Sequence, residues 1–182
     1  MGGKLVLYAA ASLDGYLAES DGGIRFLDET PTSLSALGYE QFYETVGAII
    51  MGGKTYRQVA DELFPDKWPY AGKPCYVYSR TQSHRAEHVE FTTLPPASLL
   101  QKIRKEHEGD IWLMGGGETI RLFMRENLVD RYCIYLMPTL LGDGIPLFST
   151  SFPKTNLVLE SAKNIDAVIE LIYSASVPAV FS

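Results

Sequence analysis

Three glycines interrupt a strongly apolar stretch of this chain, and they constrain its fold more than any other feature. Residues 111–114 read Ile-Trp-Leu-Met, which suits a strand buried on both faces, as in a parallel sheet. The glycines at 115–117 then end the strand, because glycine tolerates positive φ and lets a backbone or a ligand approach closely. Apolar residues recur at helical spacing from Ile120 to Met124, so a helix is expected directly after the glycines.

The junction of a strand with a helix N-terminus is a favourable place for an anion. The first N–H groups of the helix have no partner within it, and the helix dipole presents its positive end. A tight turn with close packing explains the same glycines without any ligand, since such turns are common in α/β proteins. The motif G-x-G-x-x-G would require glycine at Ile120, and no lysine follows as a P-loop requires.

Two further strand ends carry residues that suit an anionic ligand. A strand over 48–51 is closed by two glycines and followed by Lys54-Thr55, and a strand over 74–78 ends in Ser79-Arg80. A Walker A motif would need glycine where Ala48 stands, so a P-loop is rejected here as well. In open α/β sheets, ligands bind outside the carboxyl ends of the strands. The three strand ends together therefore predict a long ligand with several phosphates, such as a dinucleotide with an extra phosphate.

Strands and helices alternate along most of the chain, and the pattern changes near its end. The expected strands are 4–10, 48–51, 74–78, 89–92, 111–114, 131–137, 157–163 and 168–174. The expected helices are one from Thr32 or Ser33 to about Val46 with Leu37, Phe42 and Val46 inside, one over 54–63, one from Pro95-Pro96 to before Gly109, and one over 118–126. This order predicts an α/β fold, with a mostly parallel central sheet and a C-terminal antiparallel hairpin.

Length and composition predict one globular domain over residues 1–182. The net charge of −6 argues against a general nucleic-acid-binding surface, and no apolar run approaches the roughly 20 residues of a membrane span. Cys75 and Cys133 have no zinc-site spacing, which favours a reducing, cytoplasmic setting, and no metal site is predicted. The apolar run over 5–13 could serve as a signal segment, but a buried first strand is favoured.

The motifs at the strand ends, taken in order, resemble the dihydrofolate reductase-like family, particularly the reductase domain of bacterial riboflavin biosynthesis. The matching pieces are residues 10–15, 51–56, 79–80, 114–118 and 128–148. The resemblance implies a three-layer fold with helices on both faces of the sheet. It also implies an NADPH-dependent reductase of a pyrimidine- or pteridine-like heterocycle, similar to 5-amino-6-(5-phosphoribosylamino)uracil reductase.

The resemblance further implies which residues meet the cofactor. It puts the nicotinamide against Ala10 and the glycine turn, the phosphate bridge at Lys54 and Thr55, and the 2′-phosphate at Ser79-Arg80. The cofactor-binding residues implied in this way are Ala10, Gly52, Lys54, Thr55, Ser79, Arg80, Met114, Gly115, Gly116, Gly117, Glu118 and Thr119. The candidate substrate contacts are Asp14, Leu17 and Phe42. Asp14 could instead hydrogen-bond its own turn, and the other two could be core residues.

The chain departs from the family pattern at two places. Gly53 stands where the phosphate loop of the family often has arginine. Dihydrofolate reductase itself has a tryptophan followed by an acidic residue on the flap and next helix, whereas Trp68 and Trp112 both lie elsewhere. No proton donor is assigned. The alternatives are dihydrofolate reductase proper and a non-catalytic NADP-binding module. The deaminase domain that often accompanies the reductase carries an H-x-E motif together with C-x-x-C, and this combination does not occur here.

The C-terminal strands predict a homodimer. The run over 168–173 is apolar at nearly every position, so both of its faces need cover, and an exposed strand edge of this kind invites pairing with another chain. A buried central strand would explain the same composition without a partner. The resemblance also implies a dimer, and a twofold arrangement is the commonest closed one.

Overall fold

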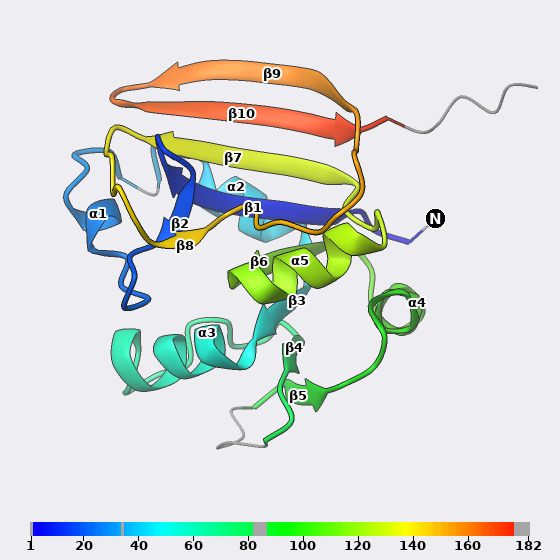
Figure 1. Ribbon diagram of the computed structural model, residues 1–182. Helices are drawn as coiled ribbons and strands as arrows, with labels where there is room; N and C mark the ends of the chain where they lie inside the picture. Colours follow the sequence, from blue (N-terminus) through cyan, green and yellow to red (C-terminus); the bar gives the residue numbers. More distant parts are fainter. Residues whose placement is uncertain (1, 34, 82–86, 177–182) are drawn as a thin grey trace, which may run out of the picture.

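The computed structural model describes residues 2–33, 35–81 and 87–176 (Figure 1). An eight-stranded sheet with the order β5-β4-β3-β6-β1-β7-β10-β9 forms its centre. The strands of this sheet are β1 (Leu5–Ser12), β3 (Val46–Gly52), β4 (Cys75–Tyr78), β5 (Val89–Thr92), β6 (Asp110–Gly115), β7 (Arg131–Met137), β9 (Leu157–Ile165) and β10 (Val168–Ala175). The short strands β2 (Tyr16–Ala18) and β8 (Ile145–Pro146) pair separately.

The direction of the strands confirms the predicted fold class. Every pair from β5 to β7 is parallel, whereas β10 is antiparallel to β7 and β9 is antiparallel to β10. The central strand β1 lies between β6 and β7, with Leu5 opposite Ile111 and Ala10 opposite Tyr135. The sheet is therefore mostly parallel, with an antiparallel hairpin added at one side.

Helices cover both faces of the parallel part, as the three-layer prediction requires. On one face lie α4 (Pro96–Glu106) and α5 (Gly117–Arg125), whose apolar residues pack on Leu5, Leu7 and Ile50. On the other lie α2 (Tyr39–Thr45) and α3 (Gly53–Arg57), which pack on Ile49, Met51 and Trp112. A π-helical segment, η1 (Gln58–Leu63), continues α3, and the short helix α1 (Arg25–Asp28) packs through Phe26 beside β7 and β10.

The central strands are apolar on both faces because helices cover both faces. Along β3, Ile50 packs toward α4 and α5 while Ile49 and Met51 pack toward α2 and α3, and all three side chains are fully buried. Fully burying one such side chain contributes about 1.5–3 kcal/mol. The continuous apolar runs of the sequence therefore mark the strands that carry the core.

The predicted helix from Thr32 or Ser33 to about Val46 begins too early, whereas its end at Thr45 lies one residue from the expected position. Gly38 has φ of 72°, a left-handed conformation that ends any helix coming from Ser33, and α2 begins only after it. Leu37 lies before the helix, and it packs on Phe26 and Tyr135. Val46 is buried as the first residue of β3 rather than as the last of a helix.

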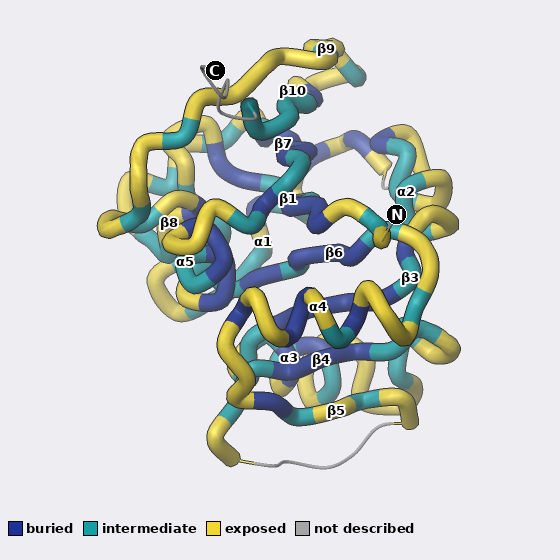
Figure 2. Tube along the Cα trace, turned by 90° about the vertical axis from the view of Figure 1, so that its right-hand side faces the viewer, coloured by how far each residue is buried: buried dark blue, intermediate teal, exposed yellow. Residues whose placement is uncertain are grey.

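The C-terminal hairpin differs from the expectation in which strand forms the edge. β10 is paired on both sides, by β7 and β9, so the apolar run over 168–173 is an inner strand. The edge is β9, which is mostly exposed (Figure 2). Leu157, Val158 and Leu159 of β9 expose between 40% and 53% of their surface.

Candidate functional site at the strand ends

The three predicted strand ends meet at one side of the sheet. A methyl group built on Gly52 would lie 2.6 Å from Oγ1 of Thr119, and one built on Gly116 would lie 3.3 Å from Oγ1 of Thr55. A methyl group on Gly53 would lie 3.0 Å from both Cβ and Oγ of Ser79. The ends of β3, β4 and β6 and the starts of α3 and α5 are therefore in direct contact.

The glycine turn leads from β6 into α5 without any intervening loop. Gly115 has φ of 124°, which side chains rarely allow, and the peptide bond to Gly116 is cis. Gly116 caps α5, and its carbonyl accepts hydrogen bonds from the N–H groups of Thr119 at 2.9 Å and Ile120 at 3.1 Å. These two N–H groups are thus used within the turn, which leaves those of Gly117 and Glu118, at the start of α5, to receive an anion.

Charged residues border this turn. Lys54 lies in the first turn of α3 and Arg80 follows β4; both are exposed, and neither forms an ion pair with another described residue. Glu118 in the first turn of α5 is also exposed, and its carboxylate pairs with Arg121 at 2.5 Å. Two cations are thus available at the strand ends, while the one acidic side chain in the first turn of α5 has a cationic partner of its own.

A flap made of β2 and β8 packs against the glycine turn. Leu17 of β2 would lie 3.6 Å from a methyl group on Gly115. Pro146 and Ile145 of β8 would lie within 3.2–3.3 Å of one on Gly117. The predicted substrate residue Leu17 therefore borders the glycine turn. Ile145 and Pro146 are not among the predicted site residues, although they lie within residues 128–148, one of the segments that resemble the family.

Asp14 holds the flap together. Its carboxylate accepts hydrogen bonds from the Ser12 hydroxyl at 2.6 Å and from the N–H groups of Leu141 at 3.1 Å and Gly142 at 2.7 Å. The Ser12 bond, followed by the two N–H bonds, lowers the pKa of Asp14 below its usual value. The predicted hydrogen bond within the turn is present, and Asp14 also binds a loop more than 120 residues away in sequence.

Ala10 and Phe42 lie on the face of the sheet that α2 covers. Ala10 packs with Phe26 and Leu37, near the carboxyl end of β1. Phe42 of α2 stacks on Tyr8, with ring centres 4.0 Å apart, and meets the Trp112 ring edge-on at 5.5 Å. Phe42 is therefore part of an aromatic cluster, which is the packing alternative considered for it. Its contact with a substrate stays a prediction.

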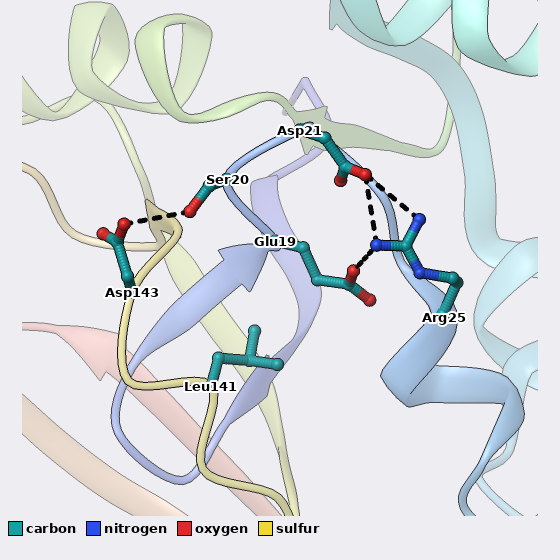
Figure 3. A pocket seen from close by; sticks show the side chains of 6 residues that line it. All are labelled: Glu19, Ser20, Asp21, Arg25, Leu141 and Asp143. Atoms are coloured by element: carbon teal, nitrogen blue, oxygen red, sulfur yellow. Dashed lines mark hydrogen bonds and ion pairs between the residues drawn. The ribbon is translucent and has the colours of Figure 1, made fainter.

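An open pocket of about 420 Å³ lies beyond the flap (Figure 3). Arg25 pairs with both Glu19 and Asp21, and the Ser20 hydroxyl donates to Asp143 at 3.0 Å. The pocket is lined by three carboxylates and one guanidinium group, and that group is already paired with two of them, so the pocket does not suit a phosphate. None of the predicted cofactor residues lines it.

Metal and thiol chemistry find no support in the described part of the chain. No group of three or more His, Cys, Asp or Glu residues there could hold a metal ion. Burial raises the pKa of Cys75 to about 12 and that of Cys133 to about 11, so both thiols stay protonated at neutral pH. Within the same residues, no helix has the length and apolar character needed to cross a membrane.

Known proteins resemble this chain over nearly its whole length. The family model of the RibD C-terminal domain matches residues 3–171. An uncharacterized protein of Bacillus subtilis (strain 168), YwjB, is 37% identical over 171 residues, which are 93% of this chain and 97% of YwjB. The crystal structure of a candidate riboflavin biosynthesis protein from Shewanella sp. PV-4 has a TM-score of 0.84 at 26% identity, covering 97% of this chain and all of that one.

A longer protein shares the fold over part of its length. RibD of Acinetobacter baumannii shares the fold with a TM-score of 0.71 at 20% identity, and the match covers 96% of this chain but 58% of that protein. The family expected from the motifs is thus confirmed by a match over nearly the whole sequence. The chain belongs to the RibD C-terminal domain family.

Proposed function

We propose that the chain is an NADPH-dependent reductase that transfers a hydride to a pyrimidine- or pteridine-like heterocycle. The observation that supports it most is the convergence of Gly52, Thr55, Ser79 and the glycine turn at the carboxyl end of a parallel sheet. A Thermotoga maritima protein of the same fold is a deaminase and 5-amino-6-(5-phosphoribosylamino)uracil reductase. Reduction of such a ribosylamino-pyrimidine is the activity that we propose to test first.

The cofactor would lie along the strand ends. The N–H groups at the start of α5, with Lys54 and Thr55, would hold the pyrophosphate, because they offer donors and positive charge to it. Ser79 and Arg80 would receive the adenosine ribose and its 2′-phosphate. The nicotinamide would lie by the glycine turn and Ala10, and NADPH would supply the hydride when it is bound.

The flap supports the chemistry by its position. Leu17 and the β8 residues Ile145 and Pro146 lie against the glycine turn, so they would press on the reactive end of the cofactor and keep water from it. The fold would thereby align the reduced ring with an electron-poor carbon of the substrate.

Oxidation of NADPH in the presence of a substrate panel tests this proposal. The panel contains the ribosylamino-pyrimidine with and without its phosphate, dihydrofolate and a dihydropterin, and NADPH loss is followed by absorbance. Turnover of a pyrimidine supports the proposed activity, and turnover of dihydrofolate alone would indicate dihydrofolate reductase instead. NADPH binding without turnover of any compound would contradict the enzyme and favour a binding module.

A further inference from the structure

A groove of about 260 Å³ lies on the face of the sheet that α2 covers, and none of the predicted cofactor-binding residues lines it. Its floor comes from β1, β7 and β10, and α2 lies beside β1 and β7 in both views of the fold (Figures 1 and 2). Of the residues predicted for the proposed function, only Phe42 reaches it. Phe42 is a candidate substrate contact, whereas the proposed function assigns no role to the other residues that line the groove.

A buried carboxylate with an unused oxygen lines this groove. Glu170 of β10 is only 8% exposed, and its Oε1 accepts a hydrogen bond from the Tyr135 hydroxyl at 3.0 Å. Its Oε2 is buried without any hydrogen-bond partner among the described residues. The Nζ of Lys163 lies 3.7 Å from Oε2, which is too far for a hydrogen bond, and that lysine side chain is 65% exposed. A buried carboxylate oxygen without a donor is costly, so it points to a donor that enters from outside.

The walls next to Glu170 are flat and aromatic. The rings of Tyr8 and Phe42 stack with centres 4.0 Å apart, and the Tyr135 ring is tilted against Tyr8 at 5.0 Å. Burial raises the pKa of Tyr8 to about 12, so its hydroxyl stays neutral at physiological pH and adds no charge to the groove. Arg131, the cation that lines the groove, is paired with Glu160 at 2.7 Å. The unused acceptor therefore belongs to a groove with aromatic walls, and Arg131, the cation that lines the groove, is already paired.

We propose that this groove binds a small flat ring that carries an amidinium, guanidinium or ring amino group. The N–H groups of that substituent donate to Oε2 of Glu170, and the ring lies against Tyr8 and Phe42. A charge-assisted hydrogen bond to a carboxylate is among the strongest in proteins, and aromatic rings favour both stacking and cations. The volume suits one or two rings, since it is slightly below the roughly 300–1,000 Å³ of drug-sized sites.

The competing explanation is structural. Glu170 and Lys163 are directly opposite on β10 and β9, so the carboxylate could serve only as one half of a cross-strand ion pair. This explanation predicts that Lys163 matters for the state of Glu170 and that no ligand does. The two explanations therefore differ in what Lys163→Gln and Glu170→Gln do to binding.

Calorimetric titration of the full chain with benzamidine tests the proposal, and acetophenone serves as the ring of similar shape without N–H groups. Benzamidine is expected to bind and acetophenone is not. Glu170→Gln, which keeps the size of the side chain but removes its charge, should weaken benzamidine about tenfold or more. Lys163→Gln should bind benzamidine at least as tightly as the wild type. No benzamidine binding, equal binding of both rings, or equal binding by Glu170→Gln would each overturn the proposal.

A filling variant tests the location without touching the carboxylate. Cys133 lines the groove and is nearly buried, so Cys133→Leu places extra carbon atoms inside it. Thermal unfolding first shows that this variant folds. A folded Cys133→Leu protein should lose benzamidine binding, and unchanged binding would place the ligand elsewhere and overturn the assignment.

Discussion

Single side chains hold the candidate site together across long distances in sequence. Asp14 accepts two backbone hydrogen bonds from the loop before β8, and Ser12, which is fully buried, donates to it. The Ser12 oxygen in turn accepts the N–H of Tyr16 at 2.9 Å. This chain of bonds fixes the turn between β1 and β2, and with it the strand that carries Leu17 beside the glycine turn.

Asp14→Asn should lower the melting temperature at neutral pH, because an amide offers one acceptor oxygen where the carboxylate offers two. The folded-state pKa of Asp14 is lowered, so its contribution is present above the ordinary value of 3.8 and is lost as the pH falls through the lower folded-state pKa. The difference from the wild type should therefore shrink in strong acid. Thermal unfolding over a pH series measures this, with Asp61→Asn on exposed η1 as the control. A constant difference at every pH would contradict the carboxylate's role.

Arg80 is the residue that we expect to set cofactor preference. An exposed arginine at the end of β4 can pair with the 2′-phosphate of NADPH, whereas NADH lacks this group. Arg80→Ala should weaken NADPH about tenfold and leave NADH nearly unchanged, as measured by titration of both cofactors. Arg125→Ala is the matched control, because Arg125 is the last residue of α5 and lies at the end away from the glycine turn. This variant should keep the preference for NADPH. Equal affinities of the wild type for both cofactors would argue against this assignment.

At the scale of elements, the glycine turn and the flap form the two sides of the candidate cofactor site. The turn brings the first N–H groups of α5 to the carboxyl ends of the strands, and β8 touches the turn through Pro146 and Ile145. β2 and β8 pair with each other, so the two parts of the flap form one structural unit. The flap depends on the hydrogen bonds that the loop before β8 donates to the Asp14 carboxylate.

Gly116→Val should lose NADPH binding far more than it loses stability. The φ of Gly116 is −71°, which any residue adopts, and an added methyl group would lie 3.3 Å from Thr55 Oγ1, a tight contact that a small shift of the Thr55 side chain would relieve. The side chain would, however, occupy the approach to the N–H groups of α5. NADPH binding is measured by titration and folding by thermal unfolding. The NADPH affinity of Gly116→Ala should fall between those of the wild type and Gly116→Val. A folded Gly116→Val protein that binds NADPH normally would place the cofactor elsewhere.

At the scale of the whole molecule, the sheet has a covered part and an uncovered part. Helices cover the strands from β4 to β1 on both faces, whereas β9 forms an exposed edge beyond β10. Leu157, Val158, Leu159 and Ile169 expose apolar surface on this hairpin. An exposed edge strand that carries apolar side chains is typical of surfaces that pair with another chain.

We therefore propose that the chain forms a homodimer through the C-terminal hairpin. Light scattering at micromolar concentration should give about twice the chain mass of 20.2 kDa. Val158→Lys should shift the protein toward monomer, because a charge would be buried in the contact. Leu140→Lys, at a loop residue that is 70% exposed, is the matched control and should change nothing. A wild-type monomer, or a dimer that Val158→Lys leaves intact, would contradict this proposal.

The sequence alone predicted the strands of the main sheet, their mainly parallel direction and the glycine junctions, but not the short strands β2 and β8. The bounds of β5 and β7 agree with those expected at every residue, because short apolar runs between turn signals leave little freedom. The start of the helix before β3 was predicted too early, because the left-handed conformation of Gly38 is not visible in a pattern of apolar residues. Motifs in order also predicted the family, which the match over residues 3–171 confirms.

Only the tertiary structure decided which residues meet. The partner of Asp14 lies 127 residues away, and the contacts of Gly117 with Pro146 and of Glu170 with Tyr135 cross between separate elements. Local patterns report the period of burial along one segment, but they do not report which segment packs against it. The edge position of β9 and the groove beside Glu170 depend on strand order and on the placement of α2, which form only when the whole sheet assembles.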